Sequence, residues 1–248
     1  MCIFSRNVEH VSATKIFARG LPDGRQVLIY AMDVAMAEDL AMVLPLPVPA
    51  NGPDDAVEFV SLEAYPTLFD DLKRAFPRIV ALGRSKGIED LEQSLSLVVH
   101  TVGAFEASFV PHPRDFARLD ARFRLPGRVL DAVPAYADWG FAVFQLRAAR
   151  DGTSIHPMAL RFPRRDRRAV FFPTVHVHDG SVPAAAAFDH ALYAQHVDTD
   201  RRWTESMGPL ATAVDANRAH DLVDPDAPGV MLELHGQHPN RDVWLRAQ

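Results

Sequence analysis

The 248-residue chain contains a single cysteine, Cys2, so an internal disulfide framework is excluded. It has no G-x-S-x-G elbow, no P-loop and no G-x-G-x-x-G fingerprint, so lipase-like, nucleotide-hydrolysing and dinucleotide-binding classes have no support. No run approaches the roughly 18 consecutive apolar residues of a membrane span, and no secretory signal opens the chain. The sequence therefore predicts a cytoplasmic protein without a membrane partner.

An excess of positive charge is also lacking, because 26 lysines and arginines stand against 32 aspartates and glutamates and the formal net charge is −6. This balance gives no reason to expect nucleic acid as a partner. The hydrophobic content of 48% is ordinary for a globular protein. Internal repeats, low-complexity tracts and long linkers are absent from the sequence, so we expect one domain over residues 1–248.

Most of the chain has the alternating apolar pattern of β-strands. Residues 14–19 and 25–33 flank Leu21-Pro22-Asp23-Gly24, a turn sequence that predicts a hairpin. Residues 141–146 and 155–162 flank a second turn-like sequence, 150–153, and predict another hairpin. Further strands are expected at residues 40–44, 94–110, 169–177, 188–195, 230–234 and 242–245.

Helical patterns are short and few. Leu68, Leu72 and Phe76 recur every four residues between two prolines, which predicts a short amphipathic helix. A helical turn is expected at 113–119 and a second short helix at 128–136. The predicted fold class is α+β: a β-rich single domain, with mostly antiparallel sheets and a few short helices.

Cys2 is the first candidate for chemistry, because bacterial removal of the initiator methionine works well before a small residue. The new terminus would carry a thiol and an α-amine on one residue, a nucleophile with its own base for attack on amides and thioesters. Retention of Met1 would block that amine. The alternative is structural: Cys2 is a small apolar residue that opens a buried strand.

The segment around residue 176 carries the densest chemistry of the chain. His176 and His178 alternate on a predicted strand and therefore share one face, a spacing that suits a single metal ion. Asp179 would orient one ring or act as a third ligand. Zinc is the expected metal and copper the second choice, since imidazole suits both. The alternative is a solvated or hydrogen-bonded pair at a strand end.

Two more histidines join this group if the predicted strands are neighbours. His156 lies on the strand before His176, and His190 lies on the strand after it, followed by His196. The metal ligands expected from the sequence are therefore His156, His176, His178 and His190.

Residues 164–168 read Arg-Arg-Asp-Arg-Arg and look like an anion-binding patch. They stand between two predicted strands of an acidic protein, and an aspartate interrupts them. A solvated hairpin turn is the interpretation that this pattern favours.

Two regions, 8–49 and 139–173, resemble the uncharacterised bacterial domain-of-unknown-function family 2330. The likeness is carried by a cysteine near the N-terminus and by the residues Thr14-Lys15-Ile16-Phe17-Ala18, Leu40-Ala41-Met42-Val43-Leu44-Pro45-Leu46-Pro47 and Gly140-Phe141-Ala142-Val143-Phe144. Members are often exported and have paired N-terminal cysteines, from which this chain departs. The resemblance implies a single β-rich domain.

The Met-Cys start also resembles N-terminal nucleophile hydrolases such as bile-salt hydrolases and glutamine amidotransferases. Ile3 stands where the amidotransferases have a glycine, so the resemblance concerns chemistry alone.

These patterns lead to three hypotheses. The first is a cysteine-dependent hydrolase or acyl-transfer enzyme that acts on a small-molecule or peptide substrate, with Cys2 as nucleophile and His176, His178 or His190 as acid–base partner beside Asp179. The second is a zinc- or copper-binding protein that uses His176 and His178. The third is a non-enzymatic domain that binds a partner through an edge strand.

Overall fold

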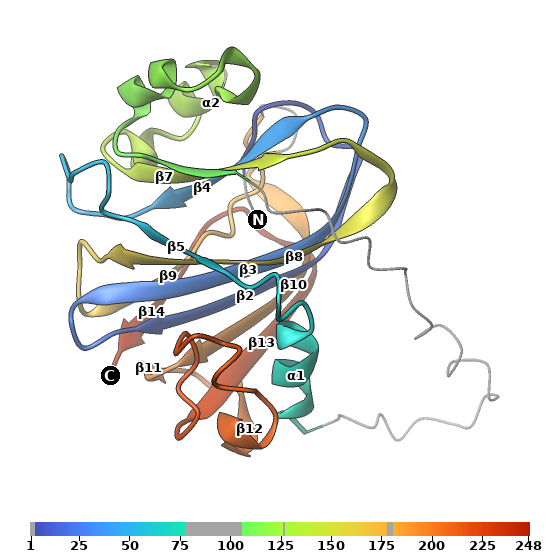
Figure 1. Cartoon of the computed structure of the whole chain (residues 1–248), viewed down its shortest axis with the longest axis vertical. Helices are drawn as coiled ribbons and strands as arrows, with labels where there is room; N and C mark the ends of the chain where they lie inside the picture. Colours follow the sequence, from blue (N-terminus) through green and yellow to red (C-terminus); the bar gives the residue numbers. More distant parts are fainter. Residues whose placement is uncertain (1–2, 78–105, 126, 178–180) are drawn as a thin grey trace.

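Three β-sheets form the framework of the computed structural model, which describes residues 3–77, 106–125, 127–177 and 181–248. Figure 1 shows the sheets stacked, with short helices near the two ends of the molecule. The prediction of a β-rich fold with mostly antiparallel sheets and few short helices is confirmed at this level. No helix among the described residues is long and apolar enough to cross a membrane.

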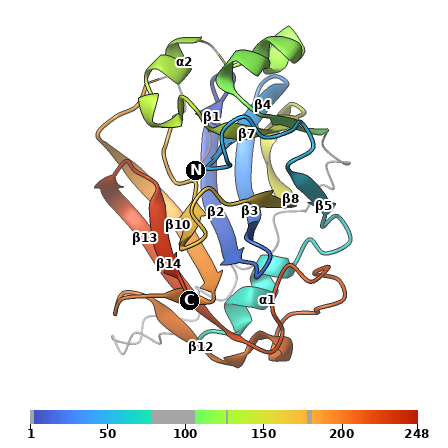
Figure 2. The same cartoon turned by 90° about the vertical axis from the view of Figure 1, so that its left-hand side faces the viewer.

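The largest sheet has seven strands, and much of it can be followed in Figure 2. In spatial order they are β12 (Thr204–Pro209), β13 (Pro228–Pro239), β10 (Ala185–Gln195), β2 (His10–Gly20), β3 (Arg25–Met36), β8 (Ala149–Pro163) and β5 (Glu58–Ser61). All neighbours in it are antiparallel except β10 and β2, which are parallel.

Two smaller sheets pack with the large one. The four-stranded sheet has the order β1 (Ile3–Phe4), β4 (Leu40–Leu46), β7 (Gly140–Leu146) and β6 (Ala107–Val110). The three-stranded sheet has the order β11 (Val197–Asp198), β14 (Val243–Ala247) and β9 (Ala169–Phe172). Helical elements are α1 (Leu68–Arg74), α2 (Gly127–Asp131) and short turns of 3₁₀-helix at Pro113–Arg118, Ala121–Phe123, Pro134–Tyr136 and Leu210–Thr212.

Buried apolar residues cover both faces of the large sheet, which is why β3 is apolar along nearly its whole length. On one face Leu28 and Tyr30 pack against β4 and β7 of the four-stranded sheet. On the other face Val27 and Ile29 pack under α1. A third cluster lies between the four-stranded sheet and α2 with its neighbouring 3₁₀ turns. The molecule is therefore layered, with helices outside both sheets (Figure 1).

The expected hairpin of β2 and β3 is present, and local chemistry explains its turn. Pro22 and Asp23 occupy the corner, and Gly24 follows with φ +89°, a left-handed conformation that favours glycine. The Gly24 N–H donates to the Leu21 carbonyl at 3.1 Å. The Asp23 carboxylate accepts the N–H of Arg25 at 2.9 Å, as aspartate does in tight turns.

The second predicted hairpin is wrong. Residues 150–153, interpreted as a turn, lie inside β8, which runs from Ala149 to Pro163 and pairs with β3. Strand β7 joins the other sheet, beside β4. Long-range pairing with β3 overrides the local turn preference of the sequence, and the register shifts between β3 and β8 accommodate the mismatch.

Two other predictions need adjustment. The helix expected at 128–136 is divided into α2 and the 3₁₀ turn at Pro134–Tyr136, because a residue before proline avoids the helical conformation and Val133 has φ −124° and ψ 62°. The strand expected at 94–110 is seen only as β6, since 94–105 lie outside the described residues. That the whole chain is one domain stays a prediction.

A buried glutamine connects the large sheet to the three-stranded sheet. Gln26 on β3 is fully buried, and its amide nitrogen donates to the Phe171 carbonyl at 2.7 Å. Its amide oxygen accepts the Phe171 N–H at 3.0 Å. The side chain thus satisfies both main-chain polar groups of a residue in β9, as a neighbouring strand would.

We expect Gln26→Leu to lower the free energy of unfolding by about 2–6 kcal/mol, because it leaves two buried main-chain groups of Phe171 without partners. Urea denaturation measures the change. Gln237 is exposed on β13, so Gln237→Leu is the matched control and should stay within about 0.5 kcal/mol of the wild type. Equal stability of the two variants would contradict the assigned role of Gln26.

Candidate functional site

The histidine-bearing segment that follows β9 is held by side chains instead of by a strand ladder. Strand β9 ends at Phe172, earlier than expected. Beyond it, the Asn240 amide accepts the N–H of His176 at 2.7 Å and donates to the His176 carbonyl at 3.0 Å. The Asp242 carboxylate accepts the N–H groups of Thr174 and Val175 at 2.9 and 3.2 Å. These bonds fix the main chain at His176.

The structure brings two of the predicted site histidines together. The rings of His176 and His190 are stacked, with centroids 5.2 Å apart. Phe188 contacts both rings, at centroid distances of 4.3 Å and 4.9 Å. Both histidines are buried, with exposed fractions of 6% and 2%. We call His176, Phe188 and His190 the histidine cluster.

The beginning of the chain lies beside this cluster. Ile3 forms a parallel bridge with Val177, and the Phe4 N–H donates to the Val177 carbonyl at 3.4 Å. The first described residue therefore stands next to the residue between the two alternating histidines. Cys2, His178 and Asp179 themselves lie outside the described residues. Their approach to one another stays a prediction.

His156 lies elsewhere, because the strands expected to be neighbours are not. Strand β8 pairs with β3 and β5, β9 pairs with β14, and β10 pairs with β13 and β2. His156 lines a 280 Å³ cavity with Phe59 and Phe144, whereas His176 lines a 400 Å³ cavity with His10. The expected convergence of His156 with His176 and His190 is therefore not found.

No group of three histidine, cysteine, aspartate or glutamate side chains that would hold a metal occurs within the described part of the chain. Since His178 and Asp179 are outside that part, a zinc or copper site at His176 and His178 stays a prediction.

Asp242 is the titratable group that holds the segment before His176. Loss of hydration raises the pKa of its carboxyl group, although the hydrogen bonds from Tyr136 and from the N–H groups of Thr174 and Val175 act in the opposite direction. Burial and the nearby Asp242 carboxylate also raise the pKa of the Tyr136 hydroxyl, which donates to Asp242. Folding therefore makes ionisation of both groups less favourable than in the unfolded chain.

A raised folded-state pKa means that Asp242 favours folding fully only at low pH. Above the unfolded pKa of about 4, the contribution of Asp242 to the free energy of unfolding should fall as pH rises through the folded pKa. The side chain of Asp242→Asn does not titrate, but its amide oxygen can still accept the N–H groups of Thr174 and Val175. The fall in the free energy of unfolding with rising pH should therefore be absent in this variant. Urea unfolding of both proteins between about pH 4 and 8 measures it, and identical pH profiles would contradict the assignment.

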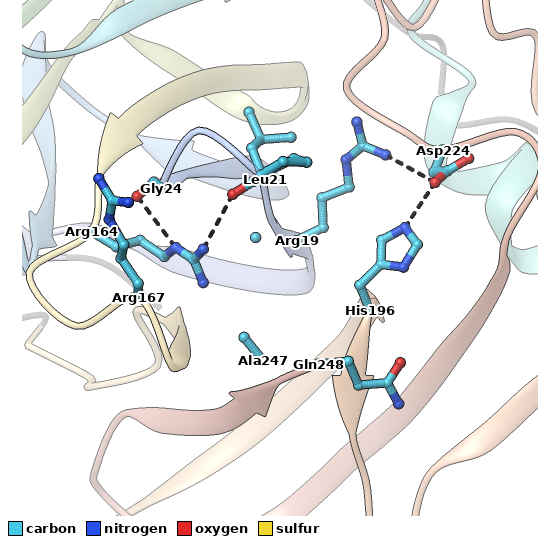
Figure 3. Close-up of a pocket in the computed structure, with 11 residues that line it drawn as sticks. Arg19, Leu21, Gly24, Arg164, Arg167, His196, Asp224, Ala247 and Gln248 are labelled. Carbon is cyan, nitrogen blue, oxygen red and sulfur yellow. Dashed lines mark hydrogen bonds and ion pairs between the residues drawn. The ribbon is translucent and has the colours of Figure 1, made fainter.

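A second candidate site is an arginine-lined cavity of 710 Å³, shown in Figure 3. Its walls come from the β2–β3 turn, the β8–β9 loop, the β10–β11 junction, residue 224 and the last residues of β14 and the chain. The titratable side chains that line it are Arg19, Arg164, Arg167, His196 and Asp224. We call this the arginine cavity.

Two guanidinium groups lie against the β2–β3 turn because glycines leave room for them. A Cβ atom on Gly20 would lie 2.6 Å from an Arg164 nitrogen, and one on Gly24 would lie 2.5 Å from the Nε of Arg167. The Arg164 guanidinium donates to the carbonyls of Leu21, Gly24 and Ala169 at 3.3, 3.4 and 3.3 Å. These partners are neutral. Burial and the charge of Arg167 together lower the pKa of Arg164.

Asp224 and His196 form the opposite wall (Figure 3). The His196 Nε2 lies 2.8 Å from an Asp224 oxygen, and an Arg19 nitrogen lies 3.8 Å from the same oxygen. His196, the residue directly after β10, has φ +55°, a conformation that is uncommon for residues other than glycine. Burial would raise the pKa of Asp224, but its hydrogen bond from His196 and the nearby positive charges lower it.

The sequence interpretation of residues 164–168 as a solvated turn is correct for only part of the segment. Arg165 pairs with Asp138 and Arg168 pairs with Asp166, both at the surface. Arg164 and Arg167 line the arginine cavity instead. The sequence signal was the arginine-rich loop itself, but nothing in it revealed that Arg19 and His196 lie beside it.

Comparison with known proteins shows similarity in fold without similarity in sequence. No family model and no curated protein sequence matches the chain, so its resemblance to bacterial families stays untested. The crystal structure of baculovirus P35 matches with a TM-score of 0.54 at 12% identity, over 99% of both chains. A mutated baculovirus P35 after caspase cleavage matches with a TM-score of 0.50 at 12% identity, over 95% of this chain and 99% of that one. The chain therefore has the fold of P35.

Proposed function

We propose that this protein is a partner of a caspase-type cysteine protease and is cut by it. The observation that carries the proposal is the P35 fold, which extends over 99% of both chains. A P35 chain of this fold has been captured after cleavage by a caspase. Since 12% identity leaves few contact residues in common, the protease is named by class and not by member.

A protein partner is also consistent with the surface of the described residues. The two large hydrophobic side chains that are exposed there are Met207, at 72%, and Trp244, at 46%. Trp244 packs at its inner side against Phe171 and Trp139, with ring centroids 4.7 and 6.0 Å away. An aromatic side chain held rigidly by its neighbours loses little freedom on binding, which favours contact with another protein.

Incubation with purified caspases tests this function. We expect one cut per chain, seen as two fragments on a denaturing gel, and the fragment masses locate the cut anywhere in the sequence. The same caspase with its catalytic cysteine alkylated should leave the chain whole, and baculovirus P35 is the positive control. A chain that stays whole while P35 is cut would overturn the proposal.

Acyl transfer through Cys2 is the second candidate function. The observation that favours it is the bridge between Ile3 and Val177, which holds the start of the chain beside the histidine cluster. The Cys2 thiolate would attack the carbonyl carbon of a thioester, form a new thioester and release the original thiol. A cysteine protease makes such an acyl-thioester during cleavage, so the two candidate functions share one substrate chemistry.

Release of thiol from a small aryl thioester tests the second function. The wild-type protein should accelerate the release, and Cys2→Ala should reduce the rate to that of buffer. His156→Ala changes a residue at a different cavity and should keep the wild-type rate. Cys2→Ser keeps a side chain of nearly the same size but lacks the thiol, so a loss of rate in this variant would show that the thiol itself is required. Equal rates for the wild-type and Cys2→Ala proteins would exclude this function.

A further inference from the structure

The arginine cavity contains positive charge that the described residues do not neutralise. Arg19 is largely enclosed there, with 12% of the side chain exposed. Its Nε–H is buried and has no hydrogen-bond partner in the described ranges. One of its other nitrogens donates to the Asp221 carbonyl at 2.8 Å. A buried donor without a partner is costly, so an acceptor in the cavity would stabilise Arg19.

Asp224 supplies the side-chain carboxylate that lines the cavity, and it contacts both His196 and Arg19. Its oxygen is 2.8 Å from His196 and 3.8 Å from Arg19, so the nearer partner is the histidine. Burial is the largest effect on Arg19 and lowers the pKa of its guanidinium in spite of Asp224 and Asp221. The Asp224 charge therefore does not offset the loss of hydration of the Arg19 guanidinium, and the hydrogen bonds of Arg164 go to main-chain carbonyls.

The other carboxylates beside these loops are paired with arginines that do not line the cavity. Asp23 binds Arg25 at 2.7 Å and Asp166 binds Arg168 at 3.2 Å. Arg167 itself forms no hydrogen bond or ion pair with any described residue and lies over Gly24. Three guanidinium groups thus line the space, and Asp224 supplies the side-chain carboxylate among its lining residues.

We infer that the arginine cavity binds the phosphate groups of a small phosphorylated molecule. Guanidinium groups present planar pairs of N–H donors that match the oxygens of a phosphate. The main chain at Gly20 and Gly24 has no Cβ atoms to obstruct the approach of Arg164 and Arg167. The volume of 710 Å³ lies within the roughly 300–1,000 Å³ of small-molecule sites, so it admits more than a single inorganic ion.

The inferred ligand carries at least two phosphate groups, because the side chains that would donate hydrogen bonds to it lie on different walls. Arg164 and Arg167 come from the β8–β9 loop, whereas Arg19 and His196 come from β2 and from the end of β10 (Figure 3). A diphosphate would reach both groups. This binding is independent of cleavage by a protease and of any chemistry at Cys2.

Isothermal titration with inorganic pyrophosphate in about 0.15 M salt tests the inference on the full chain. We expect one site per chain, and weaker binding by about tenfold or more in Arg167→Gln and in Arg19→Gln, since each loses charge-assisted hydrogen bonds. Arg167 is exposed and makes no hydrogen bond to the described residues, so its replacement should not disturb folding.

Arg114→Gln is the matched control, because the substitution removes the same charge. Arg114 is exposed and lies outside the loops that form the cavity. Its affinity for pyrophosphate should stay within about twofold of the wild type. Citrate, a polycarboxylate of similar charge, should bind more weakly than pyrophosphate. Absence of binding, equal losses in Arg167→Gln and Arg114→Gln, or equal affinity for citrate would overturn the inference.

Discussion

The fold depends on polar side chains that take the place of missing strand neighbours. Gln26 bonds to both main-chain groups of Phe171 and so joins two sheets. Asn240 does the same for His176, and Gln195 does it for Asp224, whose N–H and carbonyl it binds at 2.9 and 2.8 Å. Each amide binds the main-chain N–H and the main-chain carbonyl of one residue, as a neighbouring strand would. These side chains connect segments that are not paired as strands, and so separate sheets can pack together without leaving those main-chain groups unbonded.

The same device positions both candidate sites. Gln195 is buried at the end of β10 and fixes the loop that carries Asp224 into the arginine cavity. Asn240 fixes the main chain at His176 beside His190. The two sites thus lie at junctions between sheets, where the regular hydrogen-bond pattern stops and side chains determine the geometry.

Sequence patterns predicted the elements better than their partners. The β2–β3 hairpin follows from Pro22, Asp23 and Gly24, because a turn is a local matter of backbone preference. The residues 150–153 have equally good turn chemistry but lie inside β8, since pairing with β3 decides their conformation. Arg19 and His196 are far in sequence from the arginine-rich loop, so the sequence did not indicate that they lie beside it. His176 and His190 were predicted as site residues because imidazole is a common metal ligand and acid–base group, and the structure places their rings together.

The parallel pairing of β10 with β2 has a consequence for biosynthesis. Strand β2 is synthesised early and can pair with β3 as soon as both have been made. Its other edge pairs with β10, which comes from the final quarter of the polypeptide and is synthesised much later. Contacts between such distant segments slow folding, because a long loop has to close before they form. During translation an unfinished sheet edge is thus exposed on the nascent protein, a state in which aggregation competes and a chaperone would be useful.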